Sequence, residues 1–571
     1  MSRKQLNLGI LAHVDAGKTT LTERLLYEAG VIDAVGSVDA GTTQTDSLAL
    51  ERQRGITIKT AVASFTLPGG AHVNLIDTPG HPDFIAEVER ALTVLDGAVL
   101  VVSAVEGVQP QTRILMRALQ RLRVPTILFV NKTDRAGADV ERVIGEMRRK
   151  LTPAVGDAYP VLAGSARTGG GVRELMRAIP KLLPAAAGDA DAPVDGIVFK
   201  IERGPAGEKI AYVRMRAGTL RVRDRVRPGK VTALAVFEQG GAVPRPSVSP
   251  GEVAKVWGLA DARIGDRLAE PTEPDASERH FPPPTFEAAV APKDGRAAAA
   301  LRVALAQLAE QDPLIGVRDA RGELSVSLYG EVQKEVIEAT LERDYGLAVS
   351  FREVTPICVE RPAGRGEAVE VLHADTNPYL ATIGLRVEPA PAGSGVAFRL
   401  AVDHLGVPLY AYKRIDRFEE SMRQYVLEAL REGLSGWEVV DCVVTMTESG
   451  YSAPDGPPSR RGPLSTPADF RKLTPIVLGR ALVRAGTVVC EPMLRIAVEA
   501  PAPTAGAVLA ALGQLGGEIE SSSLDGELAT VDALLPAARA HHLQRRLASV
   551  AHGEATVESA FGGYRRVAGT R

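Results

Sequence analysis

Three short peptides occur in a fixed order near the start of this 571-residue chain, and each directly follows a run of apolar residues. They are Ala12-His-Val-Asp-Ala-Gly-Lys-Thr-Thr20, Asp77-Thr-Pro-Gly-His81 and Asn131-Lys-Thr-Asp134. In an open α/β sheet, ligands collect at the carboxyl ends of the strands. The three peptides therefore predict an α/β domain with one binding site, built from the loops that leave three of its strands.

The first peptide has the residues of a phosphate-binding loop. Its apolar run, Leu6–Leu11, predicts a strand, and a helix is expected to begin near Thr19. Such a loop presents backbone N–H groups and a helix N-terminus to the phosphates. We expect Lys18 to reach the β and γ oxygens and the Thr19 hydroxyl to bind Mg²⁺, although the peptide alone also fits a plain glycine turn. The expected phosphate-binding residues are Asp15, Ala16, Gly17, Lys18, Thr19 and Thr20.

The second peptide is placed to sense the γ-phosphate. Asp77 follows the strand predicted for Val73–Ile76, where its carboxylate can hold Mg²⁺ through water, and the Gly80 N–H can bind the γ-phosphate. We expect His81 to position or polarise the attacking water, because phosphoryl transfer depends on positioning and charge stabilisation more than on proton removal. A solvent-facing imidazole on a loop is the alternative interpretation of this residue.

A first switch segment is expected upstream, in Arg54-Gly-Ile-Thr-Ile58. Thr57 is the natural second hydroxyl ligand for Mg²⁺ in the triphosphate state, and its release after hydrolysis would loosen the segment. Val14 and Ile56 are expected to form an apolar gate that His81 must cross. The predicted metal ligands are Thr19, Thr57 and Asp77.

The third peptide predicts the selection of guanine. It follows the apolar strand expected at Thr126–Val130 and delivers Asn131, Lys132 and Asp134. The Asp134 carboxylate can accept hydrogen bonds from guanine N1–H and the 2-amino group together, which adenine cannot offer, and the Lys132 stem can lie over the purine. A backbone N–H of Ser165 or Ala166, after another short strand, can bind guanine O6. The set predicts GTP and not ATP.

Bulk composition narrows the class of protein. Apolar residues make up 45% of the chain and charged residues 24%, and the net charge is −3. Several domains are expected at this length, and so small a charge argues against general electrostatic binding to nucleic acid. There is no apolar run of the ~18 residues that span a bilayer, and no signal segment. We expect a cytoplasmic monomer without a DNA or membrane partner.

Shifts in composition divide the rest of the chain, and the resulting fold class is multidomain α/β. Leu183–Pro193 and Pro271–Pro284 indicate linkers, and short alternating runs between them are typical of a β-barrel. Two later segments repeat the strand, helix, two strands, helix, strand order of a ferredoxin-like fold. The predicted domains are a nucleotide-binding domain at 1–192, a β-barrel at 193–272, a ferredoxin-like domain at 283–361, a mixed α/β domain at 362–488 and a second ferredoxin-like domain at 489–567. Helices after the nucleotide-binding domain are expected at 295–311, 331–343, 415–434, 504–515 and 536–548.

This domain order resembles elongation factor G and its relatives, and within that group the chain is similar to the ribosomal protection proteins that confer tetracycline resistance. The most specific similarities lie in Asn377-Pro-Tyr379, Gly436-Trp437 and Ser465-Thr-Pro-Ala-Asp-Phe470. The resemblance covers nearly the whole chain. It implies a P-loop GTPase stimulated by the ribosome, with the 16S rRNA decoding region and the 23S rRNA factor-binding site as its partners.

In that family, the tip of the fourth domain enters the decoding centre and displaces the drug. The resemblance assigns this role to Tyr451, Arg460, Arg461, Pro463, Leu464, Ser465, Thr466 and Pro467. Relatives have a compact tip, whereas Ala453–Gly462 is an apparent insertion here. Its two arginines can press on RNA phosphates, or the loop can be a surface feature without a function. We also expect the short C-terminal helix of relatives to be absent after Tyr564.

Three functions follow from these observations. The first is a ribosome-stimulated GTPase that displaces tetracycline from the decoding site and is released by hydrolysis through His81. The second is an elongation factor G-like translation factor. The Ser-Thr-Pro segment argues against it, as does the short passage Ala166–Pro193, where elongation factor G carries an extra subdomain. The third is a GTP-dependent ribosome-binding protein without drug-displacing activity, which the altered tip and the missing helix favour.

Overall fold

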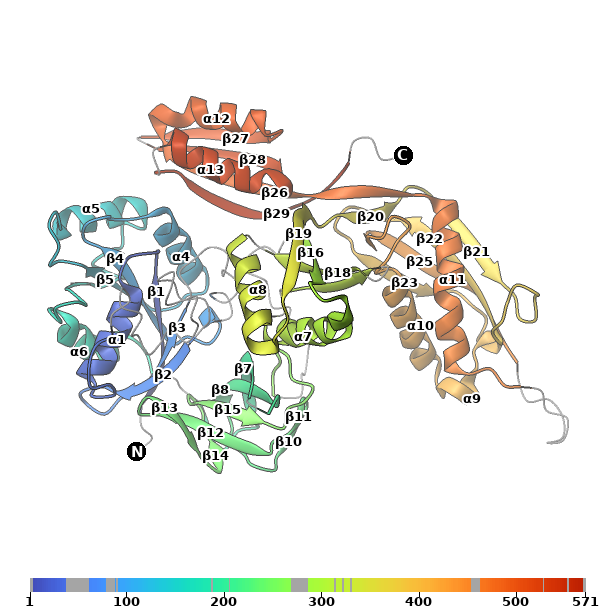
Figure 1. The fold of residues 1–571 in the computed structure, drawn as a ribbon, viewed down its shortest axis with the longest axis horizontal. Coiled ribbons are helices and arrows are strands. Elements are labelled where there is room, and N and C mark those ends of the chain that lie inside the picture. The colour runs from blue at the N-terminus through green and yellow to red at the C-terminus, as the bar shows by residue number, and fades with distance from the viewer. Residues whose placement is uncertain are drawn as a thin grey trace.

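A computed structural model describes residues 4–36, 61–78, 88, 91–185, 188–204, 206–268, 286–312, 315–320, 323–328, 331–452, 463–526, 528–551 and 554–567. Figure 1 shows a nucleotide domain in blue and cyan above a green barrel, with a first ferredoxin-like unit at the centre. A mixed α/β unit forms the end remote from the nucleotide domain, and a second ferredoxin-like unit, in red, lies across the top. The predicted fold class is confirmed.

The nucleotide domain is a doubly wound sheet with the strand order β2-β3-β1-β4-β5-β6. All neighbours pair in parallel except the antiparallel pair β2 and β3. The strands are β1 (Gln5–Ala12), β2 (Ala61–Thr66), β3 (His72–Asp77), β4 (Gly97–Ser103), β5 (Thr126–Asn131) and β6 (Val161–Ala163). The helices are α1 (Lys18–Glu28), α4 (Pro110–Arg121), α5 (Val140–Lys150) and α6 (Val172–Leu182).

Both faces of this sheet are buried. Leu8 and Ile10 of β1 pack in one apolar cluster with α1 and α6, whereas Leu100 and Val102 of β4 pack in another with α4 and α5. Burial on both faces explains why the strands are continuous apolar runs and not alternating ones. The three sequence peptides begin at the carboxyl ends of β1, β3 and β5, and these ends lie along one edge of the sheet because the strands are parallel.

The barrel contains a five-stranded antiparallel sheet with the order β13-β12-β15-β8-β7. Its strands include β7 (Asp195–Arg203), β8 (Lys209–Ala217), β12 (Ala233–Glu238), β13 (Gly241–Pro244) and β15 (Val253–Trp257). Shorter pairs complete it: β9 (Leu220–Arg221) with β14 (Ser247–Val248), and β10 (Arg225–Val226) with β11 (Gly229–Lys230). Phe199, Tyr212 and Phe237 belong to the same apolar cluster as β4 and α4 of the nucleotide domain. The two units therefore share a core.

The two ferredoxin-like units have the same topology. The first has β16 (Phe286–Pro292), α7 (Ala298–Gln311), β17 (Val317–Ala320), β18 (Glu323–Leu328), α8 (Glu331–Tyr345) and β19 (Val349–Pro356), in the sheet order β17-β18-β16-β19. The second has β26 (Thr487–Pro501), α12 (Ala505–Gln514), β27 (Glu518–Asp525), β28 (Leu528–Pro536), α13 (Ala540–Val550) and β29 (Thr556–Arg566), in the corresponding order β27-β28-β26-β29.

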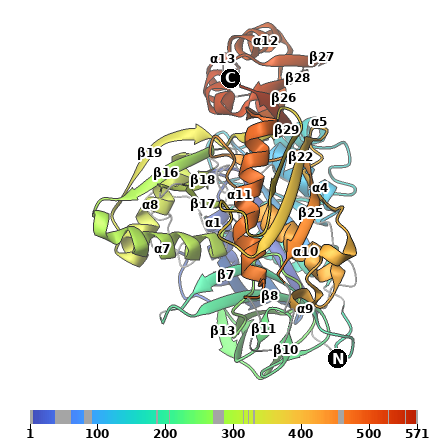
Figure 2. The same cartoon turned by 90° about the vertical axis from the view of Figure 1, so that its right-hand side faces the viewer.

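The mixed unit is a four-stranded sheet backed by two helices. The sheet has β21 (Gly366–Glu370), β22 (Ala381–Pro389), β25 (Cys442–Tyr451) and β23 (Val396–Leu400) in that order, and the short α9 (Leu409–Tyr412) lies at one end. α10 (Ile415–Ala429) and α11 (Pro467–Ala485) share a core with β22 and β25, and Figure 2 shows α11 running along the sheet.

The sequence predicted that the helix beginning at Ile415 continues to Leu434, and this end is wrong. α10 ends at Ala429 because the chain then turns, with Gly433 N–H bonded to Trp437 O at 2.7 Å. The buried Glu360 carboxylate holds that turn by accepting from Ser435 N–H at 2.6 Å and Trp437 N–H at 3.2 Å. Glu360 lies far away in the sequence, so its part in this turn is not visible locally; the local signal is Gly433-Leu-Ser-Gly436.

The strand β26 links three units. Near its start it pairs with β20 (Val359–Pro362), which also pairs with β24 (Glu438–Val439) of the mixed unit. Further along, Glu499 of β26 accepts from Arg113 Nη1 at 3.1 Å and Arg117 Nη2 at 2.6 Å, both on α4 of the nucleotide domain.

Within the described residues no helix is both long and apolar enough to cross a membrane.

Candidate nucleotide site and tip of the mixed unit

The first peptide forms the turn between β1 and α1. Gly17 has a φ of 90°, and a Cβ there would lie 2.4 Å from Asn131 Nδ2, so glycine is required. α1 begins at Lys18, and its first turn carries no acidic side chain, which leaves the helix N-terminus electropositive. Ala16 and Thr19 are buried behind this turn, while Asp15 is exposed. The turn thus has the geometry of an anion cradle.

Lys18 and Asp77 bring the first and second peptides together. Lys18 Nζ lies 2.5 Å from Asp77 Oδ1, and both side chains are buried. The register of β1 and β3 pairs Ile10 with Asp77, which sets the carboxylate beside the start of the loop. The cation predicted to contact phosphate and the carboxylate predicted to hold Mg²⁺ therefore lie in one site.

Asn131 joins the phosphate loop to the loop after β6. Its Nδ2 donates to Ala16 O at 2.9 Å, and its Oδ1 accepts from Ala166 N–H at 2.9 Å. The side chain is 2% exposed, so both bonds are shielded from water. A single buried amide therefore fixes the spacing of the predicted phosphate and guanine sites.

Lys132 and Asp134 lie on the outer side of this bridge. Lys132 has a φ of 65°, and its Nζ lies 2.9 Å from Glu106 Oε1. Asp134 is exposed, and a side-chain hydrogen bond from Ser165 lowers the pKa of its carboxyl group. Asp134 is therefore ionised at neutral pH and able to accept hydrogen bonds from a base.

The backbone donors of the loop after β6, which are predicted to bind guanine O6, make hydrogen bonds within the protein. Ala166 N–H donates to Asn131 Oδ1, and Ser165 N–H donates to Gly170 O at 2.8 Å. Guanine O6 would have to compete with a protein acceptor for either donor. The turn itself is tight, because a Cβ at Gly164 would lie 2.2 Å from Gly170 O.

The sequence analysis missed His13, which lies in the phosphate loop. Its Nδ1 lies 3.0 Å from Thr112 Oγ1 of α4, and its ring is 6% exposed. Burial lowers the pKa of His13 to about 4, so the ring is neutral at physiological pH. The imidazole therefore packs the loop against α4 without adding a charge. The sequence signal that could have identified His13 is its position inside the phosphate-loop peptide.

Several predicted residues lie outside the described residues. They are Ile56, Thr57, Gly80 and His81 of the two switch segments, and Arg460 and Arg461 of the tip. Val14, the other predicted gate residue, is 38% exposed. Thr20 is half-buried in the first turn of α1.

A second buried polar side chain, Ser465, closes the base of the tip. Its Oγ accepts from Ser452 N–H at 2.7 Å and donates to Leu380 O, while Ser465 N–H donates to Ser452 O at 3.3 Å. Ser465 is 2% exposed. The two ends of the chain that flank 453–462 are therefore tied together, and we call Leu380, Ser452 and Ser465 the tip base.

Neighbouring residues support the tip base. Thr466 and Asp469 form a capping box at the start of α11, and Pro467 occupies the first position of that helix. Tyr451 lies against Tyr410 of α9, with ring centroids 5.7 Å apart, and Tyr410 Oη donates to Ser465 O at 2.7 Å. Leu464 is 41% exposed, and Pro463 is also exposed. Of the predicted tip residues, the Ser-Thr-Pro segment thus serves as an anchor.

Four family models match the chain on either side of the barrel, and none of them covers residues 186–280. The family described as Elongation factor Tu GTP binding domain matches residues 3–185. Elongation Factor G, domain III, matches residues 281–353, and Elongation factor G, domain IV, matches residues 349–486. Elongation factor G C-terminus matches residues 488–571.

Curated proteins extend the similarity over the full length. An oxytetracycline resistance protein of Streptomyces rimosus is 42% identical, over 99% of this chain and 96% of its own. The tetracycline resistance protein TetM of Streptomyces lividans is 42% identical over 97% and 96%, and TetP of Clostridium perfringens is 34% identical over 99% and 95%. A crystal structure of a protein from Thermus thermophilus shares the fold, with a TM-score of 0.64 at 23% identity over 100% of this chain and 98% of that one.

Proposed function

This chain belongs to the tetracycline resistance proteins of the elongation factor G superfamily, and on that premise we propose that it displaces tetracycline from the decoding site of the ribosome. It is a ribosome-interacting GTPase, which converts GTP and water to GDP and phosphate. The observation that best supports nucleotide binding is the pair of hydrogen bonds made by the Asn131 side-chain amide, which join the phosphate loop to the guanine loop. The remaining assignments are proposals about single residues and partners.

In the proposed site, the N-terminus of α1 and its preceding loop bind the phosphates. Backbone N–H groups from Asp15 to Thr20 face the anion, and Lys18 neutralises the β and γ oxygens, with Gly80 as a further γ-phosphate donor. Asp134 accepts from the guanine N1–H and 2-amino groups, and the Lys132 stem covers the base. Ser165 and Ala166 are the proposed partners of O6.

Mg²⁺ fits the donor set of this site. Thr19 and Asp77 supply a hydroxyl and a carboxylate oxygen close to the phosphate loop, and Thr57 would add a second hydroxyl. Hard oxygen ligands of this kind suit Mg²⁺, which keeps several waters and binds phosphates directly. The ion would neutralise charge on the phosphate oxygens during transfer.

The proposed hydrolytic residue is His81, which positions water for attack on the γ-phosphate. Val14 and Ile56 form the gate that keeps the imidazole away until the ribosome is engaged. Positioning and charge stabilisation dominate phosphoryl transfer, so turnover without the ribosome should be slow. The 23S rRNA factor-binding site is the proposed partner of this end of the molecule.

The tip of the mixed unit is the proposed drug-displacing element. The tip base ties together the residues that flank 453–462. It belongs to the mixed unit, which forms the end of the molecule remote from the nucleotide domain (Figure 1). A loop with closed ends can be pushed into a narrow RNA site without unravelling the sheet behind it. Tyr451, Arg460, Arg461, Pro463 and Leu464 are the proposed contacts with the 16S rRNA decoding region, and we propose a monomer acting in the cytoplasm.

The hydrolytic part is tested by His81→Ala. GTP binding should be retained, because the imidazole is not part of the phosphate cradle, while ribosome-stimulated hydrolysis should fall by about 10²–10⁴-fold. Phosphate release with purified ribosomes measures this. Undiminished hydrolysis would remove His81 from the mechanism.

The drug-displacing part is tested by expressing the gene in tetracycline-sensitive cells. We expect a gain in drug tolerance that both His81→Ala and deletion of Ala453–Gly462 remove. No gain from the intact gene would defeat tetracycline protection and leave a GTP-dependent ribosome-binding protein. Support of polypeptide synthesis in place of elongation factor G would instead identify a translation factor.

A further inference from the structure

We propose that Glu106, in the loop after β4, positions Lys132 for guanine binding and is thereby a positioning residue of the nucleotide site. The inference rests on the proposed guanine-binding role of Lys132. Glu106 belongs to none of the three peptides, and its role depends on a long-range contact. Four observations support this role for its carboxylate.

The first observation is the ion pair itself. Lys132 Nζ lies 2.9 Å from Glu106 Oε1, and the side chains are 21% and 41% exposed, respectively. Desolvation by itself would raise the pKa of Glu106, but the hydrogen bond and charge of Lys132 hold it below its usual value. Glu106 is therefore ionised whenever Lys132 is in place. The pair fixes the end of the lysine chain and leaves its four-carbon stem stretched between two anchored points.

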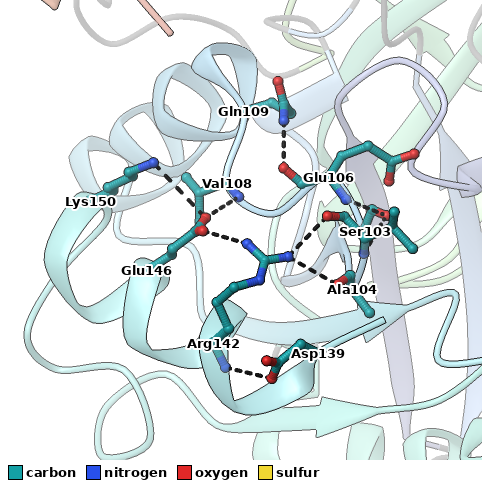
Figure 3. Close-up of polar contacts among 10 residues, drawn as sticks. Ser103, Ala104, Glu106, Val108, Gln109, Asp139, Arg142, Glu146 and Lys150 are labelled. Atoms are coloured by element: carbon teal, nitrogen blue, oxygen red, sulfur yellow. Dashed lines mark hydrogen bonds and ion pairs between the residues drawn. The ribbon is translucent and has the colours of Figure 1, made fainter. Parts of the chain in front are cut away.

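The second observation is the rigidity of the loop that carries Glu106. Ser103 Oγ accepts from Val105 N–H at 3.2 Å and from Glu106 N–H at 3.3 Å, and Gln109 Nε2 donates to Glu106 O at 2.7 Å. Figure 3 shows these bonds folding the loop over the end of β4. An exposed glutamate on a free loop would lose its partner easily, whereas here the backbone is already fixed.

The third observation is a clamp from α5, also drawn in Figure 3. Arg142 Nη2 donates to Val105 O at 2.9 Å, and Glu146 Oε2 accepts from Val108 N–H at 3.1 Å. Arg142 and Glu146 also pair with each other at 2.6 Å. Gly107 has a φ of 70°, and a Cβ there would lie 2.4 Å from Glu146 Oε2, so the clamp needs glycine at this position.

The fourth observation ties this loop to the guanine peptide. Ala104 N–H donates to Asn131 O at 2.8 Å, one residue before Lys132. The Glu106 loop and the Lys132 backbone therefore share one frame, and they cannot shift independently. Lys132 itself is held in the left-handed region, with φ at 65°, which directs its side chain away from the line of β5.

The consequence is a pre-oriented stem. A lysine side chain loses rotamer freedom when it is ordered, and a ligand that must order it binds more weakly for that reason. Glu106 orders Lys132 before guanine arrives. Because the stem would cover the face of the base, the effect should be the same for any purine that Asp134 accepts.

The test compares Glu106→Gln with wild type in the full-length protein. The Kd for fluorescent GDP should rise by about three- to fivefold, the upper part of the range for a partly exposed ion pair. The Kd for inosine diphosphate should rise by the same factor. On ribosomes, KM for GTP should rise while kcat at saturating GTP stays unchanged, which a merely destabilised fold would not produce.

A double-mutant cycle decides whether Glu106 acts through Lys132. In a Lys132→Met background, which keeps the apolar stem but not the charge, Glu106→Gln should change the Kd for GDP by less than about 1.5-fold. An undiminished effect in that background would overturn the inference, as would an unchanged Kd for Glu106→Gln alone. Glu141→Gln, an exposed carboxylate on α5, is the matched control and should change nothing.

The outcome can be separated from failure of the proposed guanine site. If Asp134→Asn shifts preference from guanine to xanthine nucleotides while Glu106→Gln has no effect, only the inference fails. If Asp134→Asn leaves guanine selectivity intact, the guanine-binding role itself fails.

Discussion

The nucleotide site and the tip base are organised in the same way but relate differently to function. Each is held by one small polar side chain, 2% exposed, that bonds to two other segments: Asn131 at the nucleotide site and Ser465 at the tip. Asn131 lies within the predicted guanine-binding peptide, so its substitution should disturb the loop structure and nucleotide binding together. Ser465 anchors a loop whose proposed contacts lie elsewhere. A sequence motif can therefore mark either the residues that bind a ligand or the residues that hold a functional loop in place.

The largest expected effect is that of Asn131→Ala. Two buried hydrogen bonds would be left without a partner, at a cost of about 2–5 kcal/mol, and GDP affinity should fall by roughly 30- to 5000-fold. Titration with fluorescent GDP measures this, and drug tolerance should be lost as well. Asn131→Asp retains the acceptor for Ala166 N–H and should be less severe. Normal GDP affinity in Asn131→Ala would show that the Asn131 bridge does not organise the nucleotide site.

The next effect is that of Ser465→Ala. The tip base would lose the Oγ bonds to Ser452 and Leu380, which should destabilise the mixed unit by about 2–3 kcal/mol. Drug tolerance should fall while GDP affinity stays unchanged. Urea unfolding followed by tryptophan fluorescence and GDP titration measure the two quantities. Ser421→Ala, a half-buried serine of α10 whose hydroxyl donates to Arg417 O of the same helix, is the control. A change in GDP affinity would show that the two regions are not independent.

A pH titration should affect the nucleotide site through His13. Burial lowers its pKa to about 4, from a usual value of about 6.5, so the folded chain binds fewer protons than the unfolded chain between these values. Stability is therefore complete above pH ~6.5 and is lost as pH falls, by about 2 kcal/mol between pH 7.5 and 5. The urea midpoint of wild type should show this loss, and that of His13→Gln should show less of it. An identical pH dependence in both proteins would contradict the assignment.

The smallest effect is expected for Thr466→Ala. Removing the N-cap of α11 should cost about 1 kcal/mol, because the capping box with Asp469 is lost while the tip base remains. The urea midpoint should fall slightly, and drug tolerance should persist. Loss of tolerance as complete as that of Ser465→Ala would mean that Thr466 has a role beyond the cap.

Local sequence was sufficient for most of the fold. Apolar runs that end in a binding peptide predicted β1, β3 and β5, because burial on both faces leaves little ambiguity. Helix positions in both ferredoxin-like units were predicted to within a few residues. The part of Glu360 in the turn that ends α10 is not visible locally, and no local pattern reports the pairing of β20 with β26.

The sequence predicted which residues belong to the candidate site. It predicted fewer of the hydrogen bonds and ion pairs between them. The Lys18–Asp77 pair and the Asn131 bridge join residues that the peptides had already named. The occupied N–H of Ala166 and the contact of Glu106 with Lys132 could not be predicted. Both contacts are made by loops that meet only when the parallel strands are assembled. The spacing of the peptides in the sequence does not predict the order of those strands.

The strand β26 has a mechanical consequence. Cys490 of this strand pairs with Val359 beside the mixed unit, and Glu499 binds Arg113 of the nucleotide domain, roughly 30 Å away along one extended backbone. A load applied at the tip is therefore carried as tension or compression along a covalent chain that is laterally braced by β28 and β29. Such a load would reach the nucleotide domain at α4, where Glu499 of the strand meets Arg113 and Arg117.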